Sequence, residues 1–133
     1  MTTEAWMADL RWNEQGLIPV IAQDWQDKTI LMMAWMNAEA LALTVETGKV
    51  VYYSRSRQGL WRKGETSGNE QILHALKLDC DSDVLLVEVE QRGDVACHTG
   101  RRSCFYKTLD AGKQWQINQP VLKDPDEMYG KKS

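Results

Sequence analysis

The pattern of hydrophobic and polar positions along this chain predicts a domain made mostly of β-strands. Residues 71–78 and 84–90 alternate between apolar and polar side chains, as strands with one buried face do. Residues 29–36 form an unbroken apolar run of the length of a buried strand. Pro19 suggests that the strand around it is the first or an edge strand. That strand is expected over the apolar residues 17–23, and β-branched and aromatic content predicts another at 50–54. A further strand is expected at 103–109.

One main helix is predicted over residues 38–47. Ala38, Leu41 and Val45 recur at helical spacing. Asn37 is suited to cap the start of this helix, and Gly48 suits a left-handed residue at its end. Many strands with one substantial helix indicate an α+β domain that contains a mostly antiparallel or mixed β-sheet.

Two other segments are predicted to lack regular structure. Residues 55–70 are polar and contain three glycines, so we expect a long functional loop there. Residues 123–133 are polar and contain a proline and a glycine, and we expect them to form a loose tail. Residues 1–122 would then make up a single domain.

Composition narrows the classes of function. The 133 residues are 43% hydrophobic and 26% charged, which is typical of a globular domain and not of a disordered chain. The net charge of -3 disfavours a protein that coats nucleic acid. No apolar run reaches the roughly 18 residues of a membrane span, and the N-terminus has no secretory pattern. We therefore expect a cytoplasmic protein with no nucleic-acid or membrane partner.

An acidic segment, Asp79-Cys80-Asp81-Ser82-Asp83, is a candidate metal site. In an extended chain its three carboxylates would share one face and Cys80 would point to the other. Carboxylate oxygens suit magnesium, calcium or manganese, whereas a thiolate suits zinc. Two metal sites at one strand end are therefore predicted. An EF-hand loop is disfavoured because Val84 replaces its glycine, and a solvated acidic turn without function remains an alternative.

The three cysteines, Cys80, Cys97 and Cys104, lack the close spacing of structural zinc sites. Three thiolate ligands leave a fourth position for water, which is typical of a catalytic zinc. Such a zinc lowers the pKa of its bound water toward about 7. His98, next to Cys97, is then a candidate general base or substrate-binding group.

Other roles for these residues stay open. The cysteines could be buried and inert, or hold a closed zinc site with His98 in a binding module without turnover. A redox disulfide between Cys97 and Cys104 is a third possibility, although no Cys-x-x-Cys motif supports it. A nucleobase deaminase is disfavoured because its H-x-E and P-C-x-x-C motifs are absent, and His74 is expected to be structural.

Basic and hydroxyl side chains in the 55–70 segment are suited to bind phosphate, although their spacing is not that of a P-loop. Trp61 is suited to stack on a base, but tryptophans lie more often in a core or an interface. The candidate substrate-binding residues are Arg55, Arg57, Trp61, Lys63, Thr66 and Ser67.

Three blocks of this sequence stand out together, namely WRKGETSG at 61–68, DCDSD at 79–83 and ACHTGRRSCF at 96–105. With LMMAWMNAEAL at 31–41, they resemble the phosphoribosyl-AMP cyclohydrolase family. The resemblance spans about residues 15–110. It implies hydrolysis of the N1–C6 bond of the adenine ring of phosphoribosyl-AMP, a step of L-histidine biosynthesis. It also implies a form without the pyrophosphohydrolase domain that is fused to this enzyme in some organisms.

The resemblance further implies an intertwined homodimer that uses zinc and magnesium. Cys80, Cys97 and Cys104 match the family's zinc ligands, and Asp79, Asp81 and Asp83 match its magnesium ligands. The zinc, one per subunit, is shared across the dimer, so Cys80 would meet Cys97 and Cys104 of the partner subunit. Zinc-bound hydroxide would attack C6, and His98 would transfer a proton or hold the ring. The residues expected to bind the two 5′-phosphates are Arg55, Arg57, Lys63, Thr66 and Ser67.

Overall fold

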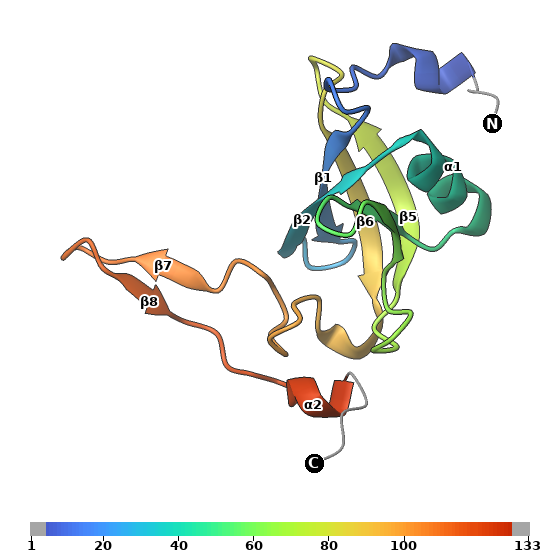
Figure 1. The fold of residues 1–133 in the computed structure, drawn as a ribbon. Coiled ribbons are helices and arrows are strands. Elements are labelled where there is room, and N and C mark those ends of the chain that lie inside the picture. Colours follow the sequence, from blue (N-terminus) through green and yellow to red (C-terminus); the bar gives the residue numbers. More distant parts are fainter. Residues whose placement is uncertain (1–4, 129–133) are drawn as a thin grey trace.

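A four-stranded mixed sheet forms the body of the molecule in a computed structural model that describes residues 5–128 (Figure 1). The strand order is β2-β1-β6-β5. The β1–β6 pair is parallel, whereas β1–β2 and β5–β6 are antiparallel. This architecture confirms the predicted α+β class and mixed sheet. The bounds of the four strands are Ile18–Asp24 (β1), Ile30–Met36 (β2), Gln71–Leu78 (β5) and Leu85–Gln91 (β6).

The helix α1, Ala38–Thr47, has the bounds and both ends that the sequence predicts. The Asn37 side chain accepts a hydrogen bond from the Ala40 N–H, at 2.8 Å. Gly48 ends the helix with a φ of 75°, and its N–H donates to the Thr44 carbonyl. The helix packs over the buried face of the sheet, where Leu41 joins the hydrophobic core.

The core lies on one face of the sheet because side chains alternate in exposure along its two inner strands. Both β1 and β6 are buried at every second position. The strand around Pro19 was predicted to be either the first strand or an edge strand. The first alternative is confirmed, and the second is wrong because β1 lies between β2 and β6. Pro19 is tolerated there because β6 pairs with β1 only from Val20 onward.

The predicted 55–70 loop is only partly a loop. Strand β4, Gly59–Arg62, lies inside that segment and forms an antiparallel hairpin with β3, Val51–Ser54, which precedes it. The sequence signal for β4 is weak because only two apolar residues stand in it, among basic and glycine residues. The hairpin brings Trp61 opposite Tyr52, a buried residue of the core.

The segment after the sheet also differs from the prediction. Only Lys107–Leu109 of the predicted 103–109 strand is extended (β7), and it pairs with β8, Trp115–Ile117. This hairpin stands away from the sheet (Figure 1). The short helix α2, Pro125–Met128, occupies the start of the predicted loose tail, and Met128 is buried. The rest of that tail, 129–133, lies outside the described residues.

Two 3-10 helices, Ala5–Asp9 (η1) and Arg92–Asp94 (η2), complete the elements. None of the helices formed within residues 5–128 has the length and apolar character needed to cross a membrane.

Candidate active site

A cavity of about 430 Å³ opens between strand β4, the loop that follows it and the segment after η2. It gathers seven of the residues that the sequence singled out. These are Arg57, Trp61, Lys63, Thr66, Ser67, His98 and Cys104. Because the 61–67 and 98–104 blocks are distant in sequence, the fold itself creates this proximity.

The wall that carries His98 is a tight loop. The Cys97 N–H donates to the Arg101 carbonyl at 3.1 Å, and the Gly100 N–H donates back to the Cys97 carbonyl at 3.0 Å. Gly100 has a φ of 88°, and a Cβ there would overlap the Lys123 carbonyl oxygen. The loop therefore turns back on itself and returns the chain to Cys104.

The thiols of Cys97 and Cys104 are neighbours, and Cys104 lines the cavity. Burial of its sulfur and the neighbouring Cys97 thiol raise the pKa of Cys104 to about 12, although the residue as a whole is exposed. The Thr99 hydroxyl donates to the Cys97 sulfur at 3.1 Å. The two thiols are soft ligands, and the Thr99 hydroxyl orients one of them, so the pair suits a zinc ion. A bound zinc would favour the deprotonated form of both thiols.

Lys63 places a positive charge beside these thiols. Only 8% of the residue is exposed, and its ammonium donates to the Ala96 carbonyl at 2.6 Å. Burial lowers the pKa of Lys63, while the Cys104 and Cys97 thiols act in the opposite direction. The ammonium also lies 5.3 Å from the centre of the Trp61 ring. Lys63 is thus fixed at the base of the cavity.

Cys80 lies far from the other two cysteines within one chain. It sits in the β5–β6 turn, whereas Cys97 and Cys104 follow the opposite end of β6 (Figure 1). The seven residues of β6 separate the two ends by roughly 20 Å at the usual rise of a strand. One chain therefore brings together two of the three predicted zinc ligands.

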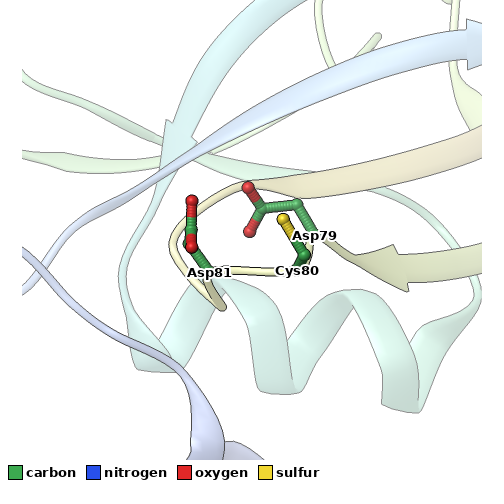
Figure 2. Close-up of side chains that lie close together, drawn as sticks. All are labelled: Asp79, Cys80 and Asp81. Carbon is green, nitrogen blue, oxygen red and sulfur yellow. The ribbon is translucent and has the colours of Figure 1, made fainter.

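The acidic segment is a turn and not an extended strand. The Asp79 carboxylate accepts hydrogen bonds from the Asp83 and Val84 N–H groups, at 3.0 and 3.2 Å. Figure 2 shows Asp79, Cys80 and Asp81 on this turn, and their ligand atoms lie within 4.8 Å of one another. The prediction that Cys80 points away from the carboxylates is wrong, because the strand β5 ends at Leu78 and its alternation ends there.

The turn also shifts the pKa values of two of its carboxyl groups in opposite directions. Although desolvation opposes the effect, the backbone N–H groups of Asp83 and Val84 lower the pKa of Asp79. Desolvation and the nearby Asp79 carboxylate raise the pKa of Asp83. Crowded carboxylates of this kind attract a hard cation, although Asp83 lies outside the close group of ligand atoms.

Some residues that shape the site were not predicted. Arg102, between Cys97 and Cys104, pairs with Asp24 at 3.4 Å and with Asp27 at 2.8 Å. These contacts join residues about 75 positions apart, so no local pattern could have shown them. The sequence marks Gly64 only as a loop glycine, but a Cβ there would overlap the Glu70 backbone.

Comparison with known proteins agrees with this arrangement. The family model described as phosphoribosyl-AMP cyclohydrolase matches residues 32–106, more than half of the chain. The chain belongs to the phosphoribosyl-AMP cyclohydrolase family. The matched range contains the hairpin β3–β4, the acidic turn and the cysteine loop.

Relatives named phosphoribosyl-AMP cyclohydrolase match over almost their whole length. The protein of Marinobacter nauticus is 61% identical over 125 residues, which cover 94% of this chain and 90% of the relative. The protein of Thioalkalivibrio sulfidiphilus is 58% identical and covers 96% of this chain and 97% of its own. That of Nitrosomonas eutropha is 58% identical, with 96% and 98% covered.

Proposed function

We propose that this chain hydrolyses the N1–C6 bond of the adenine ring of phosphoribosyl-AMP, in the pathway of L-histidine biosynthesis. The observation that carries the proposal is one cavity lined by the Cys104 thiol, which neighbours the Cys97 thiol, and by a histidine and cationic and hydroxyl side chains, in a member of this family. The cytoplasmic location expected from the sequence stays a prediction.

The proposed catalytic metal is zinc, held by Cys97 and Cys104 of one chain and Cys80 of the partner subunit. The paired thiols fit a soft cation, and the separation along β6 supports a third ligand from a second copy. When bound, zinc supplies hydroxide at neutral pH by lowering the pKa of a coordinated water. Substitution at N1 makes C6 electrophilic, so this carbon is the site of attack.

An intertwined homodimer is the proposed assembly. The β7–β8 hairpin carries apolar side chains that its own chain leaves uncovered. Leu109, Trp115 and Ile117 are 50%, 67% and 59% exposed. Exposed aromatic and aliphatic residues on a projecting arm are typical of a surface that a partner covers. A second copy would also complete the cysteine set.

Magnesium is the proposed occupant of the acidic turn, with Asp79, Asp81 and Asp83 as its ligands. The carboxylate oxygens of Asp79 and Asp81 already lie close together, which supports a hard cation at this place. Since Cys80 lies in the same turn, the zinc and magnesium sites would be neighbours in the dimer.

The chain's own residues would then hold the substrate and move protons. His98 lines the cavity beside the thiols, where it can take or relay a proton as C6 is attacked and N1 departs. Trp61 offers a ring face to the purine. The proposed phosphate-binding residues are Arg55, Arg57, Lys63, Thr66 and Ser67.

A redox function is a weaker alternative. The adjacent Cys97 and Cys104 thiols could pair in a disulfide, but a redox thiol usually has a lowered pKa. The raised pKa of Cys104 is the opposite of that requirement. Metal content after purification under reducing conditions separates the two functions, since about one zinc per chain supports the hydrolase.

Turnover of phosphoribosyl-AMP by the purified protein tests the proposed function. The reaction is followed by the absorbance change of ring opening, with and without a zinc chelator. We expect turnover that the chelator abolishes and that added zinc restores. Absence of turnover in zinc- and magnesium-replete protein would contradict the proposal, and turnover unaffected by complete zinc removal would contradict the metal assignment.

A further inference from the structure

A second cavity, also of about 430 Å³, adjoins the active-site cavity. Arg57 and Trp61 line both cavities, so these two side chains form the boundary between them. The second cavity is bordered by strand β2 and by residues 54–57, which we call the arginine turn. The arginine turn connects β3 to β4.

The arginine turn has the side chains needed to bind a phosphate. The hydroxyls of Ser54 and Ser56 are 3.3 Å apart, and the Arg57 N–H donates to the Ser54 hydroxyl. The Arg55 guanidinium lies over the Trp35 ring, 4.6 Å from its centre. This stacking orients a planar group whose N–H donors match phosphate oxygens.

The two arginines of the turn lack a carboxylate partner. Within residues 5–128, the salt bridges involve neither Arg55 nor Arg57. By contrast, Arg92 and Arg102 are both paired with acidic side chains. Two cations beside two hydroxyls at a cavity therefore favour a doubly charged anion over a neutral group.

We propose that the arginine turn binds the 5′-phosphate of the N9 ribose arm, and that the 64–67 loop binds the 5′-phosphate of the N1 arm. This assignment rests on the proposed function. C6 must lie near Cys104 and His98, which line the first cavity together with Thr66. N1 is bonded directly to C6, so its arm stays in that cavity. N9 belongs to the other ring of the purine, so its arm crosses Trp61 into the second cavity.

The test compares the binding of AMP and adenosine to the full-length, zinc-replete protein by titration calorimetry. AMP is the substrate without its N1 arm, and adenosine also lacks the N9 phosphate. Arg55 lines the second cavity and not the first, whereas Thr66 lines only the first. We expect Arg55→Ala to weaken AMP binding about tenfold or more and to leave adenosine binding unchanged. We expect Thr66→Val to retain the wild-type ratio of the two affinities.

Two further variants keep the result interpretable. Ser56→Ala removes one hydroxyl of the arginine turn without removing the stacked guanidinium, and we expect a smaller loss confined to AMP. Arg92→Ala removes an exposed arginine that lines neither cavity and should change neither affinity. Loss of AMP preference in Thr66→Val, with Arg55→Ala unchanged, would overturn the assignment. Equal wild-type affinities for AMP and adenosine would overturn it as well. Failure of the proposed function would show separately, as absence of phosphoribosyl-AMP turnover by the wild type.

Discussion

At the scale of single residues, Gly64 determines the course of the loop that lines the candidate active-site cavity. Its φ is 85°, and a Cβ would overlap the backbone nitrogen of Glu70. The Gly68 N–H also donates to the Gly64 carbonyl at 2.8 Å, which closes the loop. Thr66 and Ser67 therefore depend on a residue without a side chain for their position.

Replacement of Gly64 by alanine is expected to lower kcat/KM by about tenfold to a hundredfold, because the displaced loop no longer positions the substrate. The protein should still bind zinc, measured as metal content. Gly16→Ala is the matched control, since Gly16 has a φ of 75° but no atom within 4 Å of the position that a methyl group would take. That control should lose about 1 kcal/mol of stability and no activity. Equal activity loss in both variants would contradict the steric argument.

His98 and Cys104 line the same cavity, but their replacement by alanine should affect zinc content differently. His98→Ala is expected to lower kcat by about 10²- to 10⁴-fold, because proton transfer loses its group, while the zinc content stays at the wild-type level. Cys104→Ala is expected to lose zinc and activity together. Zinc analysis and turnover on the same samples distinguish the two. Loss of zinc in His98→Ala would make His98 a ligand and not a proton-transfer group.

At the scale of elements, an ionic contact ties the turn between β1 and β2 to the cysteine loop. Arg102 of that loop pairs with Asp27 of the turn at 2.8 Å. The Thr29 N–H and, to a lesser extent, Arg102 lower the pKa of Asp27 to about 2. Asp27 is therefore charged at neutral pH, and its ion pair with Arg102 is lost when Asp27 takes up a proton.

Replacement of Asp27 by asparagine is expected to destabilise the protein by at most about 1 kcal/mol at pH 7, because the pair is partly exposed. Since the folded pKa is lowered from 3.8, this contribution is present above about pH 4 and declines between pH 4 and 2. Urea unfolding of both proteins from pH 7 to 3 measures the difference. Asp9→Asn, on an exposed residue outside the salt bridges of residues 5–128, is the control. A difference in unfolding free energy that stays constant down to pH 3 would show that the ion pair of Asp27 does not cause it.

The elements that the sequence predicted well are those specified by local patterns. The helix α1 was found with both ends, because Asn37 and Gly48 make short-range hydrogen bonds. The strands β5 and β6 followed from apolar alternation, β2 from an unbroken apolar run and β1 from its apolar content. The hairpin β7–β8 was largely missed because its residues are all exposed and obtain no burial from their own chain.

The candidate site was predictable in its residue types and only partly in its geometry. The 61–68 and 96–105 blocks do meet at one cavity. The alternation argument failed at the acidic segment, because Ser82 adopts a φ of 63° and the chain reverses there. The separation of Cys80 from Cys97 follows from the length of β6, a strand that its alternation predicts.

At the scale of the whole molecule, the arrangement of cysteines makes two copies of the chain the proposed functional unit. Each copy would contribute Cys80 to one zinc site and Cys97 with Cys104 to the other. This division is directly testable, because complementary defects placed on different chains can combine into one intact site.

Mixing Cys80→Ala and Cys97→Ala proteins, with subunit exchange, is expected to restore about a quarter of wild-type activity. Half of randomly formed dimers are mixed, and each mixed dimer has one complete set of cysteines. Mixing Cys97→Ala with Cys104→Ala is the matched control and should restore nothing, because both changes affect the same half of the site. Absence of recovery in the first mixture, with exchange verified by native mass spectrometry, would contradict the shared site.

The length of β6 then has a consequence for how the proposed dimer would hold zinc. A ligand set divided between two chains is complete only while those chains are associated, so metal retention follows mass action in protein as well as in zinc. Dilution alone would release zinc from the site, and a more concentrated sample would hold it more tightly in the same buffer. With the proposed shared site, the spacing along one strand would make zinc affinity a function of protein concentration.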